Sequence, residues 1–192
     1  MSTEISVGAK IRSVRESKNV GLDELSQKCG LPVEQLAALE DGAPLPGIGP
    51  LMKIARALGV RLGTFLDDSQ QNGPVVCKSA ERKPVIRFSN NSENKNSAKL
   101  LYQSLSAGKE SKSMDPFIID ILPDSTKDYV PSSHEGEEFI FVLSGKVEIV
   151  YGKNSYILEK GDSIYYDSIV KHHVHGADDQ PAQILAVIFT PY

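Results

Sequence analysis

Two histidines and one glutamate in the C-terminal half have side chains that can jointly bind a divalent metal ion. His134 and Glu138 are four residues apart at the start of an apolar run, and His172 lies on a later one. If they converge inside a barrel, two imidazoles and one carboxylate leave three coordination positions of the ion open. Such a set suits Fe(II) and also serves Mn, Ni or Zn. The alternative is that residues 134–139 form a solvated loop followed by a strand.

The segments around these residues have the period of β-strands. Runs rich in Ile, Val, Phe and Tyr are separated by turn signals such as Ser144-Gly145. Alternation along a strand puts His172 on the opposite face from His173 and His175, which makes His172 the preferred ligand. Many short strands separated by turns favour a sandwich or a barrel. We expect strands at residues 116–122, 138–143, 146–151, 163–166 and 184–189.

The order of these residues resembles the two sequence motifs of the cupin family. The places of the first motif are taken by Ser132, His134, Glu138 and Gly145, and those of the second by Asp162 and His172. Ser132 stands where the family has a further histidine. The resemblance covers about residues 100–190. It implies a small jelly-roll barrel in which His134, Glu138 and His172 are the metal ligands.

Cupin barrels also imply a ligand pocket at the barrel mouth. Tyr102 and Tyr166 lie on candidate strands, where a hydroxyl group can face a bound molecule. Ser132 lies two residues before the first candidate metal ligand. We therefore expect Tyr102, Ser132 and Tyr166 to line the pocket.

The first 66 residues have the period of short helices instead. Apolar residues recur at helical spacing, and glycines at positions 21, 30, 42 and 59 separate the runs. Pro32 suits the first turn of a helix. We expect four or five helices, near residues 11–18, 22–28, 33–39, 50–58 and 62–66.

This helical pattern, over about residues 8–66, resembles the Cro/phage-repressor (XRE) helix-turn-helix family. A tight turn, Gly30-Leu31-Pro32, joins two short helices, as that DNA-binding motif requires. The resemblance implies an ion pair between Arg15 and Glu40 that locks the first helix to the reading helix. Base contacts or phosphate contacts are expected from Lys10, Arg12, Lys28, Val33, Glu34, Gln35, Ala38 and Arg56. Of these, Gln35 has the best donor and acceptor pair for adenine.

The chain therefore divides into two small domains of an α+β protein. We expect an all-α helix-turn-helix domain at residues 1–66, a linker with lead-in strands at 67–99, and an all-β cupin domain at 100–192. The first part has a net charge of +1 and the remainder −5, within a total of −4. A global positive field is absent, so DNA binding must rest on a local patch.

Sequence features bear on the cellular compartment in which we expect the protein. The N-terminus lacks the basic and apolar regions of a signal peptide, and no run of 18 apolar residues occurs. The 192 residues hold two cysteines and no Cys-x-x-Cys motif. We expect a cytoplasmic protein without a membrane span.

A Cro-type reader followed by a cupin resembles a large group of bacterial transcriptional regulators. That resemblance implies a homodimer that binds a double-stranded DNA operator and senses a small-molecule effector. The only candidate cofactor is one divalent metal ion, and no catalytic residues are expected. The alternative is an enzyme, because the same two-domain plan occurs in a mononuclear non-haem iron epoxidase that acts on hydroxypropylphosphonate. A third possibility is a metal-free binding module that no longer contacts DNA.

Overall fold

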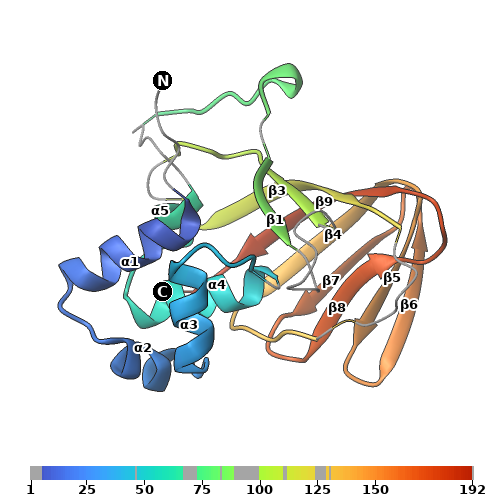
Figure 1. Cartoon of the computed structure of the whole chain (residues 1–192). Coiled ribbons are helices and arrows are strands. Elements are labelled where there is room, and N and C mark those ends of the chain that lie inside the picture. Colours follow the sequence, from blue (N-terminus) through green and yellow to red (C-terminus); the bar gives the residue numbers. More distant parts are fainter. Residues whose placement is uncertain are drawn as a thin grey trace.

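The computed structural model describes residues 6–45, 47–66, 73–82, 84–88, 100–109, 112–123, 129 and 131–191. They form a bundle of helices followed by two antiparallel β-sheets that pack as a barrel (Figure 1). The predicted α+β class, with an all-α N-terminal part and an all-β C-terminal part, is confirmed. Much of the predicted linker, at 67–72 and 89–99, lies outside the described residues. The described part of the linker contains η1 (Ser79–Glu81) and strand β1 (Pro84–Phe88).

Five helices occupy the N-terminal part, as predicted. They are α1 (Val7–Ser17), α2 (Leu22–Cys29), α3 (Val33–Glu40), α4 (Ile48–Ala57) and α5 (Gly63–Leu66). The first helix begins four residues earlier than expected, because the hydroxyl of Ser6 caps it by accepting the N–H of Ala9 at 3.2 Å. Helix α2 ends at Gly30, whose left-handed conformation starts the turn into α3.

The bundle is held by an apolar core and by one buried carboxylate. Ile11, Leu36 and Phe65 are at most 1% exposed. Glu40, at the end of α3, accepts hydrogen bonds from Nε and Nη2 of Arg15 on α1, at 2.7 Å and 2.8 Å. Nε of Arg12 adds a third bond at 3.2 Å. The structure thus contains the ion pair between Arg15 and Glu40 that the family resemblance implied.

Two antiparallel sheets form the C-terminal part. The six-stranded sheet has the order β1-β2-β3-β9-β4-β7 and the three-stranded sheet the order β6-β5-β8. The strands are β2 (Leu100–Ser104), β3 (Met114–Ile121), β4 (Glu137–Ser144), β5 (Lys146–Tyr151), β6 (Asn154–Glu159), β7 (Ser163–Asp167), β8 (His172–Gly176) and β9 (Ala182–Phe189). Strand β6 was not among the expected strands. Five of its six residues are exposed, so no burial alternation marked it.

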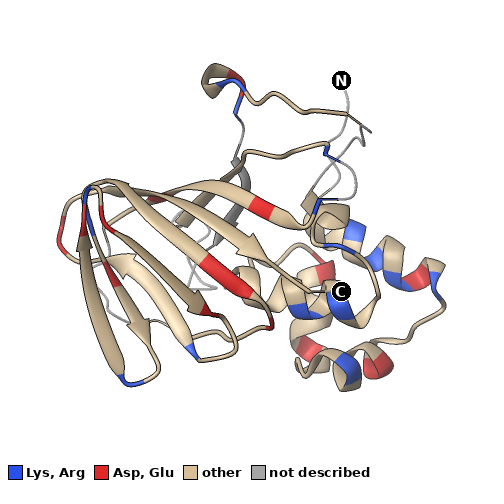
Figure 2. Cartoon of the chain, turned by 180° about the vertical axis from the view of Figure 1, so that it is seen from behind, with Lys and Arg blue, Asp and Glu red and all other residues tan. Residues whose placement is uncertain are grey.

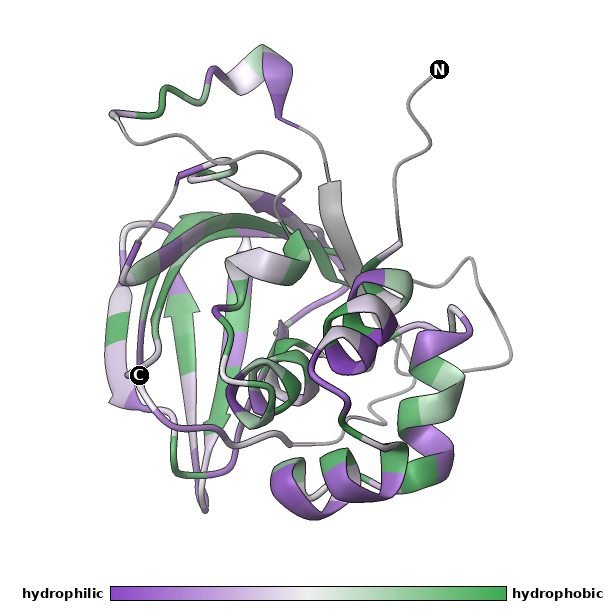
Figure 3. Ribbon diagram, turned by 90° about the vertical axis from the view of Figure 1, so that its left-hand side faces the viewer, coloured by the Kyte–Doolittle hydropathy of each residue, from purple (hydrophilic) through white to green (hydrophobic). Residues whose placement is uncertain are grey.

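Alternate residues of the strands fill the barrel. Inward-facing Ile119, Ile140, Ile149 and Ile184 are at most 4% exposed. Figure 3 shows hydrophobic segments in the strands and in the helices. No helix in the described part of the chain is long and apolar enough to cross a membrane. Cys29 and Cys77 are free thiols.

Replacing Glu40 tests the ion pair that joins α1 to α3. Burial alone would raise the pKa of the Glu40 carboxyl, but the hydrogen bonds from Arg15 and Arg12 outweigh it and lower that pKa. Glu40→Gln should lower the free energy of unfolding by about 2 kcal/mol at pH 7, because a buried charged hydrogen-bond network is broken. Urea unfolding followed by far-ultraviolet circular dichroism measures the change.

Glu16→Gln is the matched control, since the Glu16 carboxylate is 61% exposed and lies 3.6 Å from Arg15. It should cost less than about 0.5 kcal/mol. A carboxyl whose pKa is lowered by folding stabilises the fold above its unfolded pKa, so the effect of Glu40→Gln should shrink below about pH 4. Equal losses in the two variants would contradict a structural role for Glu40.

Candidate metal centre

The backbone brings three segments distant in sequence to one place inside the barrel. Ser132 and His172 form a bridge with two N–H···O bonds of 3.0 Å and 2.9 Å. The backbone N–H of His134 donates to the carbonyl of Ser168 at 3.0 Å. Gly136 has a φ of 108°, and a Cβ there would overlap the carbonyl oxygen of Phe189. Only glycine therefore fits this close approach between His134 and Glu138.

The three candidate ligands converge as the sequence predicts. Nε2 of His134 lies 2.8 Å from Oε1 of Glu138, and Nε2 of His172 lies 3.4 Å from the same oxygen. One ligand atom from each of the three residues lies within 4.8 Å of the others. His134, Glu138 and His172 are 5%, 6% and 4% exposed. The group is thus a buried His/Glu/His cluster, and not part of a solvated loop.

Backbone carbonyls orient both imidazoles for metal binding. Nδ1 of His172 lies 2.8 Å from the carbonyl oxygen of Val170, and Nδ1 of His134 lies 3.2 Å from that of Glu135. A carbonyl only accepts, so Nδ1 of each ring carries a proton. Nε2 faces Glu138, where it donates to the carboxylate while it is protonated and offers its lone pair to a metal ion once it has lost that proton. Metal-binding histidines usually have this arrangement.

The third ligand is a carboxylate in its charged form. Burial opposes the charge of Glu138, but hydrogen bonds from His134 and His172 outweigh it and lower the pKa of Glu138 to about 2. Tyr166 donates its hydroxyl to Oε2 of Glu138 at 2.6 Å. Burial and the Glu138 charge both raise the pKa of Tyr166, so its phenol stays protonated as a donor. When Nε2 of each ring is deprotonated, two imidazoles, one carboxylate and a supporting donor form a ligand set that suits a divalent ion.

A cavity of about 310 Å³ lies beside the cluster, between the barrel and the helices. Glu138 and His172 line it on the barrel side, together with Tyr102 and Ser132. These last two residues lie where the predicted pocket requires. The prediction that Tyr166 also lines the pocket is wrong. Tyr166 is not part of the cavity lining, because its hydroxyl is bonded to Glu138.

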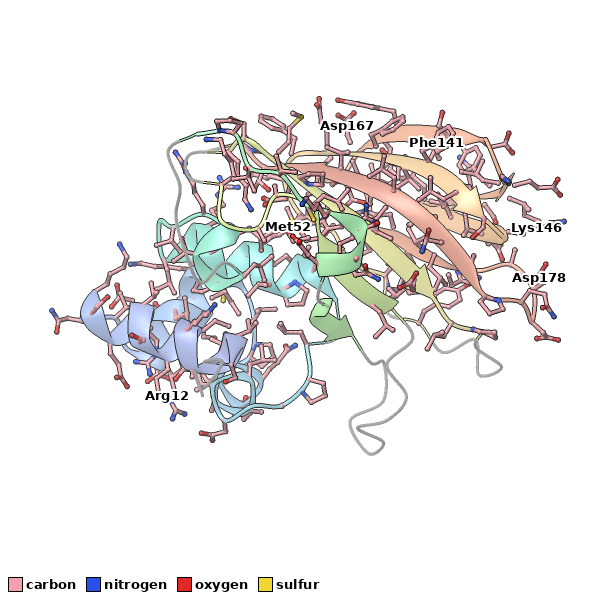
Figure 4. The ribbon with its side chains drawn as sticks, turned by 90° about the horizontal axis from the view of Figure 1, so that it is seen from above. Arg12, Met52, Phe141, Lys146, Asp167 and Asp178 are labelled. Carbon is pink, nitrogen blue, oxygen red and sulfur yellow. The ribbon has the colours of Figure 1, made fainter. Side chains whose placement is uncertain are left out.

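Helix α4 forms the opposite wall of this cavity. Ile48, Gly49, Pro50 and Lys53 line it from the helical side. A Cβ on Gly49 would stand 3.0 Å from Cβ of Ser132 and 3.7 Å from Cδ2 of His134, so the helix start packs directly on the ligand segment. Figure 4 shows Met52 of α4 where the helices meet the barrel.

An ion pair joins the two domains beside the cavity. The guanidinium of Arg56 on α4 pairs with the carboxylate of Glu135, which follows the ligand His134 in sequence. The sequence analysis did not predict that α4 and the barrel together line one cavity. The signal available was Gly49, because a glycine inside a helical run often marks a close backbone approach.

The predicted DNA-contacting residues have varied surroundings. On α3, Glu34 and Ala38 are exposed and Val33 is half-buried. Gln35, the predicted base reader, lines the interdomain cavity. Of the remaining predicted contacts, Lys10 is half-buried. The other three are cations that form ion pairs within the chain: Arg12 with Glu40 and Asp41, Lys28 with Glu24, and Arg56 with Glu135.

The other two histidines of β8 lie on its outer face. His173 and His175 both stack on the ring of Tyr129, with centroids 4.4 Å and 4.8 Å away. Nε2 of His175 also lies 3.1 Å from Oε2 of Glu148 on β5. His172 alone of the three joins the metal cluster, as the alternation predicts.

The two parts match separate protein families. Residues 10–71 match the model of the Cro/C1-type HTH DNA-binding domain, and residues 118–188 match that of the cupin domain. The described bundle and barrel have the architecture that both matches require.

The chain is similar over nearly its whole length to two kinds of protein. The chain is 26% identical over 196 residues to the (S)-2-hydroxypropylphosphonic acid epoxidase of Streptomyces wedmorensis, covering 93% of both chains. The crystal structure of an HTH_3 family transcriptional regulator from Vibrio cholerae matches 97% of this chain and 96% of its own, at 20% identity and a TM-score of 0.69. The crystal structure of the Fe(II) form of HppE matches 96% of this chain and 98% of its own, at 24% identity and a TM-score of 0.53.

Metal binding tests the cluster directly. Protein purified without chelator and titrated with Fe(II) or Mn(II) should bind about one ion per chain, measured by elemental analysis after desalting. His134→Ala and Glu138→Gln should weaken binding at least 100-fold, since each removes a ligand. Tyr166→Phe should weaken it about 10-fold to 100-fold, because it removes the hydrogen bond that holds Glu138.

His175→Ala is the control, because His175 pairs with Glu148 on the outer face of β8 and does not line the cavity. It should bind the metal as the unchanged protein does. Undiminished metal content in His134→Ala would show that the ion binds elsewhere.

Proposed function

Because the chain joins a Cro/C1-type helix-turn-helix domain to a cupin domain, we propose that it is a DNA-binding transcriptional regulator. Its cupin barrel senses a small-molecule effector with the help of one divalent metal ion. The observation that carries this proposal is the cavity at the metal cluster, which both domains line. It is of a size that suits a small ligand.

The shared wall supplies a physical route from effector to reader. A ligand changes operator affinity only if it binds one placement of the reader better than another. A molecule in the cavity would contact the metal on one side and α4 on the other. Gly49 rests against Ser132, and Arg56 pairs with Glu135, so displacement of the 132–135 segment is transmitted to α4.

The operator side of the proposal rests on the surface of α3. Glu34 and Ala38 are exposed there and face solvent in a helix that belongs to a DNA-binding fold. Several cations of the bundle are paired with carboxylates of the same chain. Few phosphate contacts per protomer follow, which predicts a weak dependence of affinity on salt. A homodimer on a two-fold operator would compensate by doubling the contacts.

Footprinting on the DNA upstream of the protein's own gene tests the regulator. A protected site should appear at low salt, and its affinity should change when the bound metal ion is removed. Ala38→Glu should reduce affinity at least 10-fold, because it adds a negative charge to the exposed face of α3. Lys146→Ala makes the same change in net charge on β5, in the barrel, and should leave affinity unaltered. Absence of a protected site with and without metal would overturn the proposal.

A second candidate function is a mononuclear iron oxidoreductase. The His134/Glu138/His172 cluster and the full-length similarity to an epoxidase favour it. Iron bound there would supply oxygen-dependent oxidation chemistry. Tyr102, Lys53 and Lys171 line the cavity and are placed to orient a substrate. Burial, with the Glu138 charge as a further cause, raises the pKa of Tyr102, which keeps its phenol a hydrogen-bond donor.

Product analysis separates the two candidates. The iron-loaded protein should be incubated with (S)-2-hydroxypropylphosphonate, oxygen and a reductant, and the mixture examined by phosphorus NMR. A regulator leaves the phosphonate unchanged over many equivalents. Conversion that is lost in His134→Ala and kept in His175→Ala would establish the enzyme instead.

A further inference from the structure

Two lysines, one from each domain, line the cavity beside the metal cluster. Lys53 lies on α4 and is half-buried, and Lys171 directly precedes β8 and is exposed. Within the described part of the chain, no carboxylate forms an ion pair with either ammonium group. Glu138 is the single acid among the described lining residues, and it is already bonded to His134, His172 and Tyr166. The cavity therefore offers two positive charges to an anion.

Most of the remaining lining is apolar. Most of the length of the barrel strands carries no charged residue (Figure 2). The apolar lining residues of the barrel strands β3, β4 and β9 are Ile119, Ile140, Ile184, Ala186 and Ile188. These five are at most 4% exposed, so they form the deep part of the cavity, whereas the exposed Lys171 lies at its mouth. A positive mouth above an apolar interior suits a molecule with an acidic head and an apolar body.

The volume and the apolar walls limit what this molecule can be. The cavity measures about 310 Å³. At roughly 30 Å³ for each water-sized group, it holds about ten non-hydrogen atoms, which is room for a carboxylate and about five further carbons. A singly charged carboxylate costs less to desolvate beside apolar walls than the nearly double charge of a phosphate or phosphonate. The better-matched head group is therefore a carboxylate.

We propose that the cavity binds a small amphipathic carboxylic acid, with its carboxylate held by Lys53 and Lys171 and its apolar chain inside the barrel. Such a carboxylate pairs with a cation of each domain at once, and so joins α4 to the segment that precedes β8. A ligand with charge contacts to both domains favours one placement of the helical domain over others. The inference rests on the proposed function, since it names the chemical class of the effector.

Calorimetric titration of the full-length protein with hexanoate tests the site. Hexanoate should bind, and 1-hexanol should bind at least 10-fold more weakly, because it has the same chain without the charge. Each methylene removed from hexanoate should weaken binding about 4-fold, since less apolar surface is buried. Hexylphosphonate should bind more weakly than hexanoate, because its larger charge costs more to desolvate.

Variants of the two lysines test the head-group contact. Lys53→Met and Lys171→Met each remove one charge and nearly keep the length of the side chain. Each should weaken hexanoate binding at least 10-fold and leave the circular dichroism unchanged. Lys146→Met is the matched control, because Lys146 pairs with Glu159 on the three-stranded sheet and does not line the cavity. It should bind hexanoate as the unchanged protein does.

Equal affinities for hexanoate and 1-hexanol, or unaltered hexanoate binding in both lysine variants, would overturn the acid site. Tighter binding of hexylphosphonate than of hexanoate would overturn the choice of a carboxylate. Operator binding is measured separately on the same protein. Hexanoate binding by a protein that protects no DNA would keep the acid site and remove the regulator. A protected operator in a protein that does not bind hexanoate would keep the regulator and overturn the acid site.

Discussion

The architecture of the barrel depends on one buried charge, the carboxylate of Glu138. A carboxylate inside an apolar barrel is costly unless it is hydrogen-bonded and paired. Two imidazoles and the hydroxyl of Tyr166 meet that need, and backbone carbonyls fix the imidazoles in turn. Each partner comes from a different segment, so the strands β4, β7 and β8 must close around one point. Gly136 permits the approach by removing a side chain that would overlap Phe189.

The helical domain packs against the segment that supplies this ligand cluster. Residues 132–135 carry His134, and α4 begins against them, with Gly49 next to Ser132. Helix α3 is linked to α1 through the ion pair between Glu40 and Arg15, which ties the two helices together. Under the proposed function, a shift of residues 132–135 would be transmitted through these contacts to the bundle. Packed interfaces of this kind have discrete arrangements and not continuous ones.

Much of the fold and of the metal cluster was predictable from the sequence, because both rest on local patterns. The glycines that end helices, the β-rich runs, and the spacing of His134, Glu138 and His172 all fall within short motifs. The interdomain wall was not predictable, since no local pattern says that Lys53 or Gln35 faces the barrel. Tyr166 was placed in the pocket by its residue type, whereas its partner depends on β7 lying beside β4. Strand β6 was not predicted, because nearly all its residues are exposed and no alternation of apolar and polar residues marks it.

The charges explain why the two domains serve one function better together than apart. The bundle has a net charge of only +1, and Arg12, Arg15 and Arg56 are engaged with carboxylates of the same chain. Such a reader gains little from the phosphate backbone, which supplies most non-specific affinity. In the proposed regulator, affinity for the operator then depends on how well two readers are spaced and oriented. Under that proposal, a ligand that alters the contact between α4 and residues 132–135 changes the placement of the reader, and this placement is the quantity to which operator affinity is most sensitive.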